Sequence, residues 1–175
     1  EAGWIGGSFA PVFENVASIG TNLLSLISDW DQGYVFLPLP FPVEIQGTVC
    51  SNVRIRVNGY LELHRTQAYD RQLTLDAFDD DLQAYPAELG SAITLADITT
   101  NGARYCVVEY RDMGFYYTGA DTNHLVSFQA VLQEGVANFA SVTFQKALGR
   151  GDGRYATLGA TAPRTTLERS YRQAT

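Results

Sequence analysis

Short runs of alternating apolar and polar residues characterise the middle of the chain. Val53, Ile55 and Val57 alternate with Arg54 and Arg56, and a period of two predicts a strand with one buried face. We expect further strands over residues 34–46, 73–78, 92–97, 103–110, 125–132, 139–145 and 155–160. Turns rich in Gly, Asn and Asp favour an all-β fold, an antiparallel β-sandwich of roughly ten short strands.

The Asn-Gly pair at 58–59 predicts a hairpin turn after residues 53–57. A two-residue turn would place Ile55 opposite a glutamate and mix the buried and exposed faces. One additional loop residue pairs Val57 with Leu61 and Ile55 with Leu63, so that apolar residues oppose each other. Because register follows the buried face, we predict a three-residue or bulged connection with this pairing.

Three prolines stand at alternate positions of the segment 34–46, namely Pro38, Pro40 and Pro42. Proline has no N–H group, and alternate residues of a strand direct these groups to the same side. The segment can therefore pair along only one of its sides. We predict that it forms a sheet edge guarded against further pairing.

The segment 103–110 is apolar on both faces, with Tyr105 and Val107 on one and Val108 and Tyr110 on the other. Such a pattern is typical of a central strand that is covered on both sides.

The two ends of the chain lack a clear alternation. The first 28 residues are glycine-rich and then apolar and almost uncharged, with apolar positions at Phe9, Val12, Phe13, Val16 and Ile19. This spacing fits a helix about as well as a strand. We expect an N-terminal arm over residues 1–21, one β-sandwich domain over 22–163 and a polar C-terminal tail over 164–175. The arm either belongs to the same core or adds as a strand to a neighbouring copy.

Charge and cysteine content narrow the partners and the compartment. A net charge of −7 excludes a phosphate-neutralising surface, so we expect no nucleic-acid partner. No apolar run approaches the roughly 20 residues of a membrane span. The chain begins with Glu1, which fits a mature product after signal removal. Cys50 and Cys106 lie on predicted strands and suggest one disulfide in an oxidising compartment; two buried free thiols are the alternative.

Several motifs follow one another along about residues 22–162. They are Asp29-Trp30-Asp31-Gln32-Gly33, Leu37-Pro38-Leu39-Pro40-Phe41, Asn58-Gly59-Tyr60, Phe128-Gln129-Ala130-Val131-Leu132-Gln133-Glu134-Gly135 and Asp152-Gly153. In this order they resemble the nidogen-like (NIDO-type) β domain of extracellular and bacterial surface proteins. The resemblance implies a secreted or surface domain used in adhesion, matrices or assemblies, and it supplies no catalytic residues.

The densest acidic cluster comprises Asp76, Asp79, Asp80 and Asp81. Carboxylates can bind Ca²⁺, but this spacing is not that of an EF-hand loop, and adjacent side chains of a strand point to opposite faces. We therefore expect a solvated turn or a cap for backbone N–H groups, with no metal and no cofactor.

The sequence also lacks a recognisable catalytic arrangement. His64 and His124, the only histidines, are far apart, and no Gly-x-Ser-x-Gly motif is present. The tripeptide Arg150-Gly151-Asp152 spells a cell-attachment sequence, but its flanking glycines favour a flexible turn. We predict that the protein is not an enzyme.

Phe115, Tyr116 and Tyr117 occupy a segment bounded by Gly114 and Gly119. If exposed, these rings form a possible ligand loop that stacks on sugars or contacts a protein partner. The alternative is a loop folded over the sandwich with its rings buried.

These features predict a structural subunit of an extracellular filament or surface assembly. The N-terminal arm would add to a neighbouring copy, and such head-to-tail contacts generate a homopolymer. The alternative is an adhesin-type module that recognises a glycan or a cell-surface protein through its loops. Both functions place the protein outside the cell or on its surface.

Overall fold

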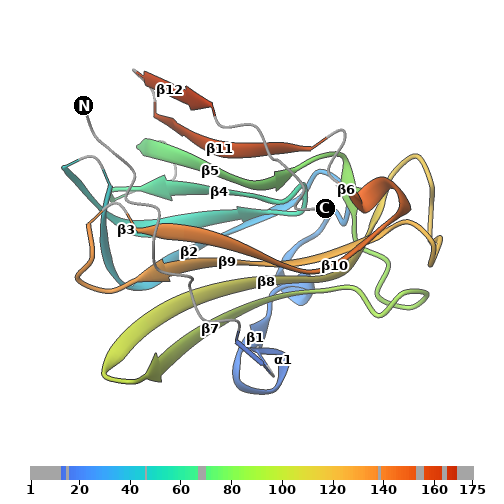
Figure 1. Ribbon diagram of the computed structural model, residues 1–175, viewed down its shortest axis with the longest axis horizontal. Helices are drawn as coiled ribbons and strands as arrows, with labels where there is room; N and C mark the ends of the chain where they lie inside the picture. Colours follow the sequence, from blue (N-terminus) through green and yellow to red (C-terminus); the bar gives the residue numbers. More distant parts are fainter. Residues whose placement is uncertain are drawn as a thin grey trace.

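Two antiparallel sheets stack face to face in the computed structural model (Figure 1). The structure describes residues 13–14, 16–45, 47–66, 70–137, 139–152, 156–162 and 165–168. The first sheet, here the β8 sheet, has the order β1 (Thr21–Asn22), β7 (Ala92–Thr100), β8 (Ala103–Phe115), β9 (Leu125–Gln133) and β10 (Ala140–Leu148), and β6 (Leu82–Gln83) pairs with β8. The second, here the β4 sheet, has the order β12 (Thr165–Glu168), β11 (Thr157–Ala162), β5 (Arg71–Asp79), β4 (Tyr60–His64), β3 (Thr48–Arg56) and β2 (Tyr34–Ile45). The predicted antiparallel β-sandwich is confirmed.

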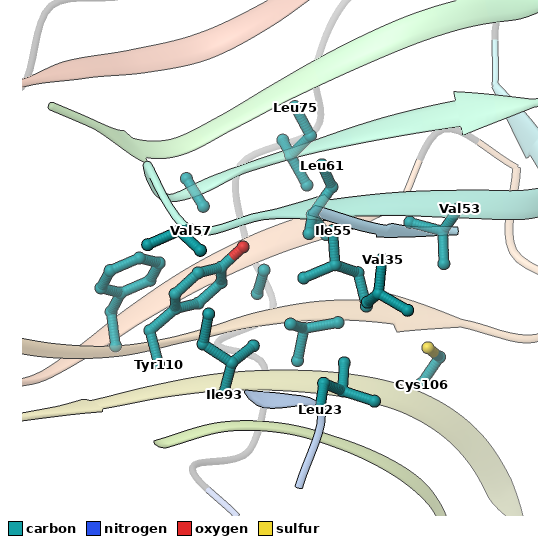
Figure 2. Close-up of a cluster of buried hydrophobic side chains, with 14 of the residues drawn as sticks. Leu23, Val35, Val53, Ile55, Val57, Leu61, Leu75, Ile93, Cys106 and Tyr110 are labelled. Carbon is teal, nitrogen blue, oxygen red and sulfur yellow. The ribbon is translucent and has the colours of Figure 1, made fainter. Parts of the chain in front are cut away.

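The main core lies between the two sheets, and Figure 2 shows part of it. Ile55 and Leu61 of the β4 sheet and Ile93 and Tyr110 of the β8 sheet are all completely buried. Burying a side chain of this size stabilises a fold by about 1.5–3 kcal/mol. The Tyr110 hydroxyl donates a hydrogen bond of 2.8 Å to the carbonyl oxygen of Arg56. The polar atom of this large ring is therefore satisfied across the core.

β2 forms one edge of the β4 sheet and, among the strands that the structure describes, pairs only with β3. Its regular register breaks between Pro38 and Val43, the stretch that also contains Pro40 and Pro42. The predicted proline-guarded edge is confirmed. At the opposite edge, β12 pairs with β11 and extends the sheet into the segment that we predicted as a polar tail.

The β3–β4 hairpin has the predicted loop length but not the predicted register. Ile55, and not Val57, lies opposite Leu61, so the three loop residues are 57–59. Gly59 has a φ of 84°, and a Cβ atom there would lie 2.1 Å from a backbone oxygen of β5. Three-residue hairpin loops commonly end in such a left-handed glycine, which fixes the position of this loop. Both registers bury the same faces, so alternation alone could not distinguish them.

The described residues of the N-terminal arm pack against their own chain. Phe13 and Val16 are buried in a second cluster with Ala96 of β7, Val107 of β8 and Val131 of β9. This cluster covers the outer face of the β8 sheet and explains why β8, which lies between β7 and β9, is apolar on both sides. The predicted central position of this strand is confirmed. Of the two alternatives for the arm, Phe13 and Val16 follow the one in which the segment packs against its own chain.

Gln129 holds the arm in this position. The Phe13 N–H donates to Gln129 Oε1 at 3.2 Å, and Gln129 Nε2 donates to the Phe13 carbonyl at 2.7 Å and to Glu109 Oε2 at 2.9 Å. The short helix α1 (Val16–Ile19) follows, and its last residue, Ile19, is 62% exposed. The predicted arm residues Phe9 and Val12 lie outside the described residues.

Cys50 and Cys106 are free thiols, so the predicted disulfide is not formed. Cys50 lies on β3 and Cys106 on β8, and each is completely buried as a small apolar side chain of the main core. Burial raises the pKa of Cys50 to about 11 and that of Cys106 to about 12, which keeps both thiols protonated. The structure thus agrees with the alternative of two buried thiols, which give no argument for an oxidising compartment.

Candidate ligand-binding site

The predicted ligand-loop residues lie where β8 ends, at one end of the sandwich (Figure 1). Phe115 is the last residue of β8 and is completely buried, whereas Tyr116 and Tyr117 are 53% and 72% exposed. The two tyrosine rings have centroids 5.4 Å apart and planes at 87° to each other. The structure therefore separates the three predicted residues into one core residue and two exposed rings.

Backbone hydrogen bonds fix the two tyrosines in a tight turn. The N–H groups of Thr118 and Gly119 both donate to the Phe115 carbonyl at 3.1 Å, and the Tyr116 N–H donates to the Asp81 carbonyl at 3.0 Å. Gly119 has a φ of 65°, which a glycine adopts without strain. A turn held in this way loses little conformational entropy when a ligand binds.

Arg150 supports Tyr117 from the 3₁₀ turn η2 (Gly149–Asp152). Its guanidinium carbon lies 5.7 Å from the ring centroids of both Phe115 and Tyr117, within the range of cation–π attraction. The Arg150 Nη2 atom lies 3.5 Å from Asp80 Oδ1. The backbone N–H of Arg150 donates to His124 Nδ1 at 3.0 Å. The Arg-Gly-Asp tripeptide is thus a turn whose arginine contacts its own protein.

β6 pairs with the end of β8, just before Tyr116. Leu82 of β6 pairs with Phe115, and both are completely buried. Just beyond this pair, the Tyr116 N–H donates to the Asp81 carbonyl at 3.0 Å, so the backbones of Asp81 and Tyr116 lie side by side.

Tyr85 lies against the same short ribbon. Its hydroxyl donates to Gln83 Oε1 at 2.6 Å, and its N–H donates to Ser91 Oγ at 3.0 Å. Its ring is so close to Gly114 that a Cβ atom there would lie 2.9 Å from the ring carbons. Gly114 therefore makes room for Tyr85 at this end of the sandwich.

A turn at residues 29–33 completes this surface. Asp29 Oδ1 accepts hydrogen bonds from the N–H groups of Asp31 at 2.9 Å and Gln32 at 3.2 Å, as in an Asx turn. The Trp30 carbonyl accepts a hydrogen bond of 2.9 Å from the Ala84 N–H, and the Trp30 side chain is 47% exposed. The sequence pattern did not indicate Trp30 or Tyr85 as site residues, although Trp30 belongs to the Asp-Trp-Asp-Gln-Gly motif.

Burial and neighbouring negative charges raise the pKa of two groups here, Asp31 and Tyr85. Burial, and then the charge of Asp81, raise the pKa of Asp31. Burial, followed by Asp31, Glu88 and Tyr116, raises the pKa of Tyr85. No cation among the described residues contributes to either shift.

The predicted acidic cluster is dispersed over different surroundings. Asp76 lies opposite Tyr60 on β4, Asp80 contacts Arg150, and Asp81 adjoins Tyr116. Burial, and then Asp79, raise the pKa of Asp76 to about 6. Within the described part of the chain, no group of three or more His, Cys, Asp or Glu residues could hold a metal ion.

A second polar network lies on the outer face of the β4 sheet. Buried Glu62 accepts a hydrogen bond of 2.7 Å from Arg54, and Arg56 and Arg71 lie 3.7 and 3.5 Å from its carboxylate. Its Oε2 atom is 3.9 Å from His64 Nε2. Three guanidinium groups compensate one buried carboxylate here, so we assign the network to stability. His64 and His124 belong to different networks.

Comparison with known proteins identifies one family. A family model described as NIDO related matches residues 6–175. A search of curated proteins and a search of solved structures each found no match. Among the described residues, no helix has the length and hydropathy needed to cross a membrane.

Proposed function

The chain belongs to the NIDO-related family, and from this premise we propose that it is a non-enzymatic binding module of an extracellular or cell-surface protein. It recognises a glycan through Tyr116 and Tyr117. The observation that carries the proposal is the exposure of two adjacent, perpendicular tyrosine rings on a turn fixed by backbone hydrogen bonds.

Tyrosine suits this role because its ring offers an apolar face and its hydroxyl group offers a polar edge. The C–H face of a sugar ring stacks on such an aromatic face, and the sugar hydroxyl groups reach the polar atoms at its rim. Asp81, whose carbonyl accepts the Tyr116 N–H, offers a polar side chain in the neighbouring backbone segment. Each aromatic contact of this kind contributes about 0.5–1.5 kcal/mol, so useful affinity requires repeated contacts along a glycan or surface.

The proposal predicts that Tyr116→Ala and Tyr117→Ala each weaken glycan binding about tenfold, because each removes a stacking surface without removing core packing. Binding is measured on a mixed glycan array, followed by titration of the best ligand. Tyr34→Ala is the matched control, because Tyr34 is also a half-exposed tyrosine (49%) but lies on β2 of the other sheet. Equal binding by all three variants would refute the proposed site.

A structural subunit of an assembly is the second candidate function. It is supported by β10, a nine-residue strand without proline at the edge of the β8 sheet, which pairs with β9 alone among the described strands. The register with β9 is regular over residues 140–144 and shifts between Phe144 and Lys146, so the regular stretch offers backbone groups to a strand of another chain. Because Phe13 and Val16 are buried within their own chain, the donor segment in this proposal is narrowed to residues 1–12.

A further inference from the structure

The chain contains two Asn-Gly pairs, and the structure places them in opposite surroundings. Asn58-Gly59 lies in the loop between β3 and β4, and Asn101-Gly102 forms the turn between β7 and β8. An asparagine that precedes a glycine is chemically labile, because the glycine nitrogen can attack the side-chain amide and no Cβ atom hinders its approach. The surroundings of each pair decide whether this attack is possible in the folded protein.

The Asn58-Gly59 pair is restrained by several contacts. Asn58 Nδ2 donates to Gln32 Oε1 at 3.3 Å. The Gly59 N–H, which would supply the attacking nitrogen, donates to the Arg56 carbonyl at 3.2 Å. The Gly59 carbonyl accepts a hydrogen bond of 3.0 Å from the Phe78 N–H, and a Cβ atom on Gly59 would overlap the Phe78 carbonyl oxygen. Neither reacting group can therefore move without breaking contacts within the β4 sheet.

The Asn101-Gly102 pair lacks such restraints. Both residues are exposed, and their φ angles of 51° and 75° are typical of a two-residue type I′ hairpin turn. Among the described residues, neither the Asn101 side chain nor the Gly102 N–H has a hydrogen-bond partner. A Cβ atom on Gly102 would meet nothing within 4 Å. The turn is closed by the pairing of Thr100 with Ala103 at the end of the two strands, so it can open without disturbing the core.

We infer that Asn101 is a site of spontaneous deamidation and that the fold protects Asn58 from the same reaction. The Gly102 nitrogen loses its proton to a base in the solvent and forms a bond to Cγ of Asn101. The bond between Cγ and Nδ2 breaks, and ammonia leaves. Water then opens the resulting cyclic imide at either of its carbonyl groups, which gives aspartate or isoaspartate. The product carries one negative charge that the amide lacks.

The reactive turn lies far from the candidate glycan-binding site. β8 begins directly after Gly102 and ends at Phe115, so this turn and the Tyr116–Tyr117 turn lie at opposite ends of a 13-residue strand (Figure 1). Deamidation therefore adds negative charge at the other end of the sandwich and should leave glycan binding unchanged.

The test follows both pairs in one sample of the folded protein. The intact chain is incubated at pH 8 and then digested with trypsin, whose fragments 57–65 and 72–104 each contain one asparagine, in an Asn-Gly pair. Mass spectrometry measures how fast aspartate and isoaspartate accumulate in each fragment. We expect the rate for 72–104 to exceed that for 57–65 by about tenfold or more, because the contacts around Asn58 hold its reacting groups apart. In concentrated urea, where both pairs are released, the two rates should converge.

Asn101→Gly is the matched control, because glycine also adopts the left-handed conformation of the turn but has no side-chain amide. The incubated variant should lack the acidic form that ion exchange separates from the original chain. Equal rates for the two fragments in the folded protein would overturn the inference, and a difference that persists in urea would overturn its structural basis. An Asn101→Gly variant that becomes acidic as fast as the original chain would also contradict the assignment.

Discussion

Asp76 shows how one residue couples protonation to folding. It lies on β5 opposite Tyr60. Burial and the nearby Asp79 raise its pKa to about 6, although the charge of Arg71 acts in the opposite direction and lowers it. The folded state therefore holds this proton more tightly than the unfolded chain. The associated stabilisation is complete below the ordinary aspartate pKa and is lost as pH rises through about 6.

We predict that Asp76→Asn stabilises the protein at pH 7 by roughly 1–3 kcal/mol, because it removes a partly buried negative charge. At pH 4, where Asp76 is protonated in the folded state, the difference should nearly vanish. Urea unfolding at both pH values measures it. Glu44→Gln, which removes an exposed carboxylate on β2, should change stability little at either pH. A gain at pH 7 that persists at pH 4 would contradict the explanation.

At the scale of elements, strand positions followed from alternation, whereas pairing details did not. The strands near 73–78, 92–97 and 125–132 are present because each alternates or is continuously apolar as its burial requires. The predicted β3–β4 register was wrong by two residues, because a shift of two residues keeps the same face buried. Only the left-handed Gly59 distinguishes the two registers. The packing of the arm was also ambiguous, because its apolar residues indicate that the segment is buried but not against which surface.

The contact between the arm and β9 gives the next prediction. Gln129→Ala should destabilise the protein by roughly 2–3 kcal/mol, because it leaves the buried N–H and C=O groups of Phe13 without their partner and Glu109 without its donor. The control is Gln145→Ala, which truncates an exposed glutamine on β10. Denaturant unfolding compares the two variants. Equal losses would mean that Gln129 does not hold the arm.

For the molecule as a whole, the sequence predicted the sandwich and its proline-guarded edge, and it left open whether the rings of residues 115–117 are exposed or buried. It did not predict that Arg150 lies beside the Tyr117 ring or that Tyr85 lies against Gly114, because these contacts depend on long-range pairing of segments distant in the sequence. The NIDO-type resemblance indicated the fold and gave no site residues, so the site had to come from geometry.

The assembly proposal is tested on the whole chain by sedimentation. If residues 1–12 join neighbouring copies, the full chain should form concentration-dependent assemblies, and a chain lacking these residues should sediment as a monomer. Retention of Phe13 and Val16 keeps the second hydrophobic cluster intact in the shortened chain. Large assemblies that persist without residues 1–12 would contradict this donor segment.

The position of Arg150 has a consequence for how the site can be isolated. Tyr117 lies in the turn after β8, its cationic support comes from η2, and the carboxylate that anchors this support directly follows β5. Three segments separated by tens of residues must come together in the folded protein before the two tyrosines acquire these contacts. A synthetic peptide that copies the Tyr116–Tyr117 turn should consequently be a poor inhibitor of the intact protein, whatever glycan it recognises.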